Sequence, residues 1–240
     1  MRRAWAVRAV IVILVLGAVA WLLLRSEFFA IEEIAIRGGE RTQRQLEGLR
    51  ELIGIAGVRV GGNIFRMDLE RAQEALLRLP WVRSVELHRR LPDRIIVRLR
   101  ERVPFLIVEL DSNSSSERFW VDRSGYLIEP AAPEAEGLLL MGVRRVETPV
   151  GPRLDAEGAA VVQAVAELAA RDPGFVARFV DLRITPQAVI LRTTRGLRVI
   201  MESTGLAEQL ERLRRLLAVI NEGHYLYLDL RFGDTVMMPR

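Results

Sequence analysis

The segment of this sequence best suited to chemistry between molecules lies close to its end. It alternates two sets of side chains: Leu226, Leu228, Leu230 and Phe232, and between them Tyr225, Tyr227, Asp229 and Arg231. Because successive side chains of a strand point to opposite faces, this pattern predicts a strand with its leucine face in a core. If that strand forms a sheet edge, its free N–H and C=O groups could receive a strand of another chain. The periodicity alone favours an ordinary half-buried strand with a solvated face.

Side chains for catalysis or metal binding are scarce. The sequence contains no cysteine and no lysine, which removes disulfides, thiolate metal sites, the phosphate-loop motif and Schiff-base chemistry. Its two histidines, His88 and His224, lack a neighbour at the spacing of metal ligands. Gly-x-Ser-x-Gly and His-Glu-x-x-His motifs are missing as well. We therefore expect no catalytic residues, no metal and no cofactor, with an anchored hydrolase whose triad is scattered in sequence as an open alternative.

The first 25 residues predict a membrane-spanning helix. A span needs roughly 20 apolar residues. The run from Ala9 to Leu24 is uncharged, and the stretch from Ala4 to Leu24 reaches the length of a span if Arg8 extends its guanidinium to the headgroups. Arginines precede the run, so the positive-inside rule places the N-terminus in the cytoplasm and the chain from Ser26 outside. We expect a cytoplasmic tail at residues 1–8 and a transmembrane helix at residues 9–25. A signal peptide cleaved after Ala20 is the alternative, but the apolar run continues past that point.

The remainder of the chain carries no net charge. Of the 35 basic residues, all arginine, four precede Ser26, which leaves 31 against 31 acidic residues. The electrostatic footprint of a nucleic-acid binder is therefore missing.

Residues 26–102 show strand and helix periods in a readable order. A strand around Ile34 and Ile36 is followed by Thr42 and Gln45, which predict a capping box for a first helix. Asp68 is a predicted N-cap of a second helix, which stops before Pro80. We expect Trp81 to cover the end of that helix as part of the core. Two further strands, joined by a turn at Pro92-Asp93, complete the order strand, helix, helix, strand, strand.

Residues 103–240 read mostly as strands with two helices. Asp155 is predicted to cap the first helix, and the second runs from Leu206 to Ile220 with a stripe of leucines. Residues 129–133 read as a linker. Strands are expected at Phe105–Leu110, Phe119–Asp122, Tyr126–Ile128, Phe179–Ile184, Ala188–Thr193 and Leu197–Met201. The fold class is therefore α+β: a membrane helix, a β-α-α-β-β domain at 26–102, and a mixed β-rich domain at 103–240.

Several short motifs in this order resemble a known family. They are Phe28-Phe29, Gly62-Asn63-Ile64-Phe65, Leu79-Pro80-Trp81-Val82, Arg90-Leu91-Pro92-Asp93 and Glu101-Arg102-Val103-Pro104. The first domain resembles a POTRA domain, and the motifs together resemble the FtsQ/DivIB family of bacterial cell-division proteins. The stretches Phe119–Tyr126 and Tyr227–Phe232 are similar to the hairpin that opens the family's second domain and to its closing strand.

The resemblance implies a non-enzymatic scaffold of the division machinery. It implies a single-pass protein of the cytoplasmic (inner) membrane at the septum, with its C-terminus outside, where it docks the extracytoplasmic parts of FtsB and FtsL and so helps to control septal peptidoglycan synthesis. Other division proteins would meet the POTRA domain. The partner-binding positions carried over are Tyr227, Asp229, Arg231 and Phe232, and we add Thr235, whose amide would face an incoming strand. A POTRA-bearing translocation or secretion component that guides client polypeptides is the alternative.

Overall fold

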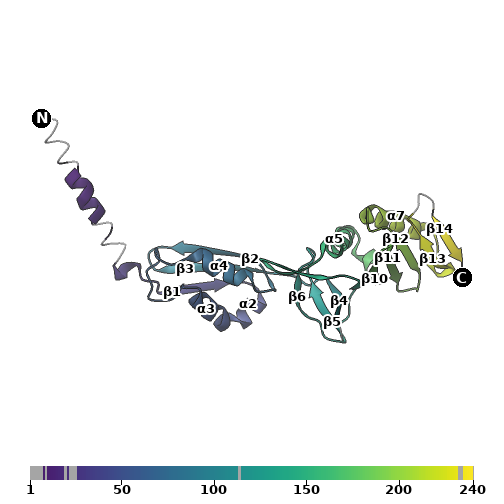
Figure 1. Cartoon of the computed structure of the whole chain (residues 1–240), viewed down its shortest axis with the longest axis horizontal. Coiled ribbons are helices and arrows are strands. Elements are labelled where there is room, and N and C mark those ends of the chain that lie inside the picture. The colour runs from purple at the N-terminus through teal and green to yellow at the C-terminus, as the bar shows by residue number, and fades with distance from the viewer. Residues whose placement is uncertain are drawn as a thin grey trace. The chain divides into compact units, whose positions relative to one another are not determined.

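The computed structural model describes residue 8, residues 10–18, residue 21, and residues 26–112, 115–231 and 235–239 (Figure 1). Its contacts divide the chain into two compact units, Met1–Glu101 and Arg102–Arg240.

The N-terminal segment is described only in part. Residues 10–18 are helical, and their large apolar side chains are exposed. Among the described residues, no helix is long and apolar enough to cross a membrane. The transmembrane helix expected at residues 9–25 lies partly outside the described residues, as does nearly all of the tail expected at residues 1–8.

The first unit contains a three-stranded sheet in the part of the chain that the structure describes. The strands follow the order β1 (Glu33–Arg37), β3 (Arg94–Glu101), β2 (Val82–Arg90), with β1 parallel and β2 antiparallel to β3. Between β1 and β2 lie α2 (Glu40–Arg44), α3 (Leu46–Ile55) and α4 (Leu69–Leu77), and η1 (Glu27–Phe29) precedes β1. The predicted order is confirmed, except that the first helix is divided at Gln45.

The predicted capping box at Thr42 is wrong. Thr42 lies inside α2, where both its backbone N–H and its Oγ1 donate to Oε1 of Glu101, each at 2.7 Å. Burial opposes ionisation of Glu101 and is the largest single effect on its pKa, but the hydrogen bonds from Thr42 and Arg41 together outweigh it and lower the pKa. The carboxylate that stabilises this helix therefore comes from the end of β3, 59 residues further along the chain.

Two other local predictions for this unit are confirmed. Asp68 is the N-cap of α4 and accepts a hydrogen bond from the N–H of Arg71 at 3.0 Å. Trp81, which follows Pro80, is only 7% exposed, and the Arg41 guanidinium lies 6.0 Å from the centre of its ring. Trp81 therefore belongs to the core at the end of the helix.

The second unit is built on one mixed sheet of nine strands among the described residues. The strand order is β14-β13-β12-β11-β10-β7-β4-β5-β6. The bounds are β4 (Leu106–Ser112), β5 (Ser115–Val121), β6 (Leu127–Pro130), β7 (Leu139–Met141), β10 (Phe179–Thr185), β11 (Ala188–Thr193), β12 (Arg198–Met201), β13 (Tyr225–Asp229) and β14 (Val236–Pro239). A separate hairpin pairs β8 (Arg145–Thr148) with β9 (Gly151–Leu154).

The helices of this unit pack against the core of the sheet. Helices α5 (Ala156–Arg171) and α7 (Leu206–Val219) contact each other, and both contribute side chains to the same buried cluster as the strands. Asp155 caps α5, accepting from the N–H of Gly158 at 3.1 Å, as predicted. The short α6 (Pro173–Val176) and η2 (Glu222–His224) were not expected. The stripe Leu206, Leu210, Leu213 and Leu217 is buried, which confirms the predicted inner face of α7.

A buried ion pair lies at the beginning of the second unit. Nη1 of Arg102 donates to Oδ2 of Asp122 at 2.7 Å, with both side chains less than 10% exposed. The other carboxylate oxygen accepts from the N–H groups of Ser124 and Tyr126, and the guanidinium lies 3.9 Å from the centre of the Tyr126 ring. This cluster ties the start of the unit to the turn between β5 and β6.

Candidate partner-docking edge

The strand singled out in the sequence is not the edge of its sheet. Strand β13 lies between β12, to which it is parallel, and β14, to which it is antiparallel. The sheet therefore ends at β14, a strand that the periodicity did not predict. The hypothesis that β13 itself offers a free edge is corrected accordingly, because its outer backbone groups are already paired.

Strand β14 presents apolar side chains on both faces. Val236, Met237 and Met238 are 51%, 40% and 47% exposed. Their partners in β13 are Asp229, Leu228 and Tyr227 respectively. Met237 therefore shares the core face of Leu228, while Val236 and Met238 share the opposite face with Asp229 and Tyr227.

The direction of the backbone groups follows from one hydrogen bond. The N–H of Leu230 donates to the carbonyl of Ile200 at 2.8 Å, so Leu230 directs its backbone groups toward β12. Since these groups alternate along a strand, Tyr227 and Asp229 direct theirs toward β14. Their partners Met238 and Val236 point back at them, which leaves the N–H and C=O of Met237 at the free edge. Continued alternation directs the N–H of Thr235 the same way.

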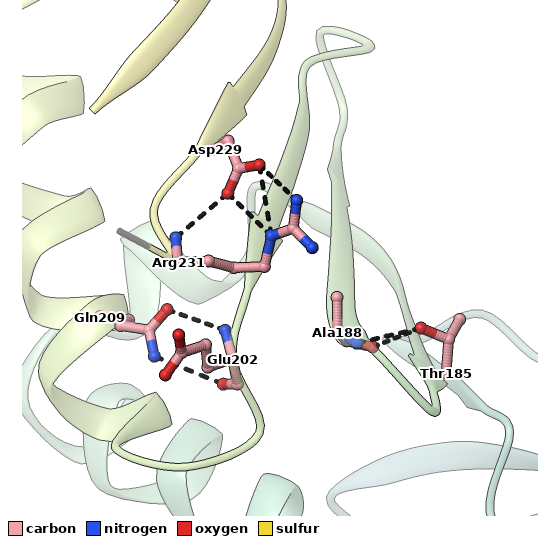
Figure 2. Close-up of polar contacts among 6 residues, drawn as sticks. All are labelled: Thr185, Ala188, Glu202, Gln209, Asp229 and Arg231. Atoms are coloured by element: carbon pink, nitrogen blue, oxygen red, sulfur yellow. Dashed lines mark hydrogen bonds and ion pairs between the residues drawn. The ribbon is translucent and has the colours of Figure 1, made fainter. Parts of the chain in front are cut away.

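The carboxylate of Asp229 and the guanidinium of Arg231 lie against each other beside this edge (Figure 2). Nε and Nη2 of Arg231 donate to Asp229 at distances from 2.7 to 3.2 Å, and the N–H of Arg231 donates to Oδ1 at 3.1 Å. The side-chain hydrogen bond from Arg231 lowers the pKa of Asp229 against the opposing effect of burial, and the same bond raises the pKa of Arg231. Asp229 is 8% exposed, so the expectation that it belongs to a displayed face is wrong.

The other candidate residues surround the same place. Thr235 is half-buried, and its Oγ1 accepts from Nη2 of Arg212 in α7 at 2.8 Å. Tyr227 is half-buried on the face of Asp229. The structure therefore brings Tyr227, Asp229, Arg231 and Thr235 together around β13 and β14, whereas Phe232 lies outside the described residues.

Two clusters that the sequence reasoning missed hold the neighbouring elements in place. The Gln209 side chain in α7 accepts from the N–H of Glu202 at 2.9 Å and donates to the carbonyl of Glu202 at 3.4 Å (Figure 2). It also donates to the carbonyl of Thr204 at 3.0 Å, and these bonds fix α7 to the end of β12. Glu222, just before β13, is 1% exposed and takes hydrogen bonds or ion pairs from Arg178 and Arg195. No local sequence pattern predicts these contacts. The partners of Glu222, Arg178 and Arg195, come from distant segments of the chain.

Among the described residues, there is no group of three or more His, Cys, Asp or Glu side chains that could hold a metal ion. What the edge offers is the outward backbone groups of Met237 and Thr235, three exposed apolar side chains and one charged pair.

Comparison with known proteins identifies the family. Residues 29–102 match the family described as POTRA domain, FtsQ-type. Residues 112–231, half of the chain, match the family described as cell division protein FtsQ/DivIB, C-terminal. The chain belongs to the FtsQ/DivIB family. The members of this family are non-enzymatic components of the division machinery. The second match ends at Arg231, so β14 lies beyond the part that the family description covers.

Individual relatives carry the same description. The chain is 27% identical over 244 residues to the cell division protein FtsQ of Anaeromyxobacter sp., covering 95% of this chain and 78% of the relative. It is 32% identical over 183 residues to FtsQ of Chloroflexus aggregans, covering 71% and 61%. For FtsQ of Syntrophotalea carbinolica, identity is 31% over 108 residues, and the match spans 45% of this chain but only 35% of the relative. Several matches thus span less than two thirds of the relative's length.

Proposed function

We propose that this FtsQ/DivIB-family chain is a division scaffold that docks the extracytoplasmic parts of FtsB and FtsL on the free edge of β14. The observation that carries the proposal is that edge. The N–H and C=O of Met237 point away from the sheet, and Val236, Met237 and Met238 expose apolar surface on both of its faces. An extended partner segment could extend the sheet and cover these side chains.

The charged pair beside β14 would set the orientation of the partner. Arg231 is held by Asp229, so a partner carboxylate would meet a guanidinium already fixed in position. Tyr227 and Thr235 would complete the surface, with Phe232 as an apolar anchor. Aromatic and arginine side chains dominate the binding energy of many interfaces, which supports this assignment.

Membrane anchoring belongs to the same proposal. The exposed apolar side chains of residues 10–18, behind the arginines at the N-terminus, support a transmembrane helix at 9–25, with residues 1–8 in the cytoplasm. Residues 26–102 would then form the POTRA domain and residues 103–240 the docking domain, outside the cytoplasmic membrane at the septum. A reporter active only outside the cytoplasm should work when it is fused after Arg240, and activity from a cytoplasmic reporter alone would refute this topology.

Cysteine cross-linking tests the docking edge directly, because the chain has no cysteine of its own. Val236→Cys and Met238→Cys, in the full chain, should each form a disulfide with cysteines placed along FtsB. The reactive FtsB positions should shift by two residues between the two variants, as strand pairing requires. Val146→Cys is the matched control: it is a similarly exposed valine of the same unit, in the separate hairpin β8–β9. Cross-links at Val146→Cys without any at positions 236 and 238 would place the dock elsewhere.

A further inference from the structure

The end of the first unit nearest the membrane segment carries a second apolar surface. We call it the apolar tip and define it by Phe28, Val60, Phe65 and Leu91, whose exposed fractions are 67%, 62%, 41% and 55%. These residues come from three separate segments of the chain. None of them takes part in the edge at β14, which lies in the other unit.

Backbone hydrogen bonds hold the first two segments together. The N–H of Ile31 donates to the carbonyl of Gly62, and the N–H of Gly61 donates back to the carbonyl of Ile31, both at 2.8 Å. The N–H of Ile64 donates to the carbonyl of Phe29 at 2.9 Å. Gly61 has a φ of +83°, which favours glycine at this turn. The loop that carries Val60 and Phe65 is therefore fixed against the segment that carries Phe28.

Three phenylalanine rings stack across this junction. Phe28 and Phe29 meet edge to face with their centres 5.1 Å apart, and Phe29 meets Phe65 in the same way at 5.1 Å. The Arg89 side chain fixes the loop from the other side, donating to the carbonyls of Ile64 and Met67 at 2.9 and 2.8 Å. The two outer rings are thus displayed by an ordered scaffold.

The turn between β2 and β3 brings Leu91 to the same end of the unit. The N–H of Glu32 donates to the carbonyl of Asp93 at 2.8 Å, and Glu33 pairs with Arg94 in the sheet. The turn that carries Leu91 therefore lies beside the beginning of β1, a few residues after Phe28 in the chain.

The sequence distance to the apolar run limits where this tip can lie. From Leu24 to Phe28 the chain advances four residues, which can span at most about 14 Å. A bilayer has a hydrocarbon core about 30 Å thick and measures about 40–45 Å with its headgroups, so each headgroup layer is several ångströms thick. If the run ends at the edge of the hydrocarbon core, Phe28 must lie within or just beside the headgroup layer.

The charges around the tip indicate which force would dominate. Five arginines near these segments are exposed: Arg59, Arg66, Arg89, Arg90 and Arg94. Five acids lie near the same segments: Glu27, Glu32, Glu33 and Asp68, which are exposed, and Asp93, which is half-buried. The basic groups are therefore balanced, and attraction to anionic lipids would be weak. The large exposed apolar side chains are the feature that distinguishes this surface, as in proteins that rest on the membrane interface.

We infer that the apolar tip rests in the headgroup region of the bilayer and so holds the POTRA unit against the membrane surface. This inference rests on the proposed membrane anchor but not on the docking edge. The apolar tip contacts lipid. Because its exposed side chains are apolar, binding of the tip to the bilayer should depend little on the charge of the lipids.

Spin labels in the full chain measure this immersion. Val60→Cys and Leu91→Cys carry the reporters, and the chain is reconstituted into vesicles of phosphatidylcholine alone or mixed with phosphatidylglycerol. The matched control is Arg100→Cys, an exposed position in β3 about 20 Å along the strand from Arg94. Labels at 60 and 91 should collide several-fold less with a water-soluble nickel chelate, and more with oxygen, than the label at 100, in both kinds of vesicle.

Replacing the exposed phenylalanines of the tip by serine should weaken its contact with the membrane. Phe28→Ser with Phe65→Ser should raise the nickel accessibility of the label at position 91 several-fold, and Phe28→Ser alone should do so in part. Equal accessibility at positions 60, 91 and 100 in the unperturbed chain would overturn the inference. Protection that is lost in vesicles without phosphatidylglycerol would show that lipid charge, and not the apolar tip, drives the contact.

Extraction with alkaline carbonate separates the inference from the anchor. A chain that resists extraction but shows no protection at positions 60 and 91 has an anchor and no resting tip. A chain that carbonate removes has no spanning helix. If such a chain nevertheless shows protection at positions 60 and 91 on vesicles before the extraction, the tip binds the membrane without a spanning helix. If it shows no protection, both the spanning helix and the resting tip are refuted.

Discussion

Replacing single residues of β14 by proline should separate the free edge from the paired edge. The N–H of Met237 points away from the sheet, whereas the N–H of Met238 points toward Tyr227. Proline has no N–H, so Met237→Pro removes a donor that only a partner could use. Met238→Pro removes a donor that β13 already uses. The side chains are similar in exposure, so they serve as matched controls for each other.

The expected magnitude follows from one hydrogen bond. A backbone hydrogen bond contributes about 1 kcal/mol net, and a carbonyl left unpaired in a closed interface costs about 1–3 kcal/mol. Met237→Pro should therefore weaken FtsB binding by about 1–3 kcal/mol, which is roughly 5-fold to 150-fold in Kd. Its melting temperature should stay close to that of the parent. Met238→Pro should instead weaken the pairing of β14 with β13.

Two measurements distinguish these outcomes. Titration of the full chain with the extracytoplasmic part of FtsB gives Kd, and hydrogen exchange at the amides of Tyr227 and Asp229 reports whether β14 remains paired. Exchange should be unchanged in Met237→Pro and faster in Met238→Pro. Met237→Ala, which keeps the amide, should bind more tightly than Met237→Pro.

If Met237→Pro binds FtsB as the parent does, with exchange at Tyr227 and Asp229 unchanged, then the outer amide of β14 is not used by the partner. The same result would remove β14 as the docking strand.

Three further predictions concern stability. Trp81→Ala should lower the free energy of unfolding by about 3–5 kcal/mol because the ring is buried. If circular dichroism shows an unchanged melting temperature while partner binding is lost, Trp81 is a contact residue instead. Asp122→Asn should cost about 3–5 kcal/mol because it leaves the Arg102 guanidinium buried without its counter-charge, and equal melting of variant and parent would contradict this. Arg231 lowers the pKa of Asp229 in the folded chain. Their pairing therefore stabilises the fold fully above the pKa of Asp229 in the unfolded chain, about 3.8, and this stability is lost as the pH falls through the lower pKa of the folded chain. Arg231→Ala should therefore lose less stability than the parent on acidification below about pH 4, and identical acid unfolding curves would argue against the pair.

The parts of the fold that the sequence predicted are those with a local cause. The stripe from Leu206 to Leu217 repeats at helical spacing, and Asp68 and Asp155 each cap the helix that begins next to them. The strands β10, β11 and β12 combine alternation with turn residues between them. In each case the residues that determine the element lie within it or immediately beside it.

The parts that escaped prediction depend on distant partners. Strand β7 has only three residues and exists because β4 and β10 pair with it on either side. The N–H of Thr42 is satisfied by Glu101, 59 residues away, so the local capping signal with Gln45 was misleading. Strands β8 and β9 have four residues each, too few to show a reliable period.

The same distinction explains the outcome at the candidate edge. Alternation correctly predicted β13 and the burial of Leu228 and Leu230. It was wrong for Leu226, which is 40% exposed, because the pairing with β14 shifts between Tyr225 and Tyr227. It could not predict that a four-residue apolar strand, β14, would return and cover the outer side of β13. It also misjudged Asp229, because the guanidinium that covers this carboxylate folds back from two residues further along the same chain.

The two ends of the large sheet differ in how their edges are protected. At the other end, β6 has Leu127 and Ile128 buried, ends at Pro130, and lies beside β9 through the bridge between Tyr126 and Arg153. Proteins protect sheet edges with prolines, charges or neighbouring elements, and β6 has such protection. The sequence of β14 has no charge and exposes three apolar side chains, with a proline only at its last position.

An edge of this length also limits what strand pairing alone can contribute. Only the backbone groups of Met237 and, by continued alternation, of Thr235 point outward, so a partner strand gains few hydrogen bonds, each contributing about 1 kcal/mol net. Binding at this edge must therefore draw on the side chains around it, including the Asp229–Arg231 pair. An FtsB peptide limited to the paired strand should consequently bind far more weakly than one that also reaches Arg231. Equal affinities for the two peptides would show that the backbone edge alone carries the interaction.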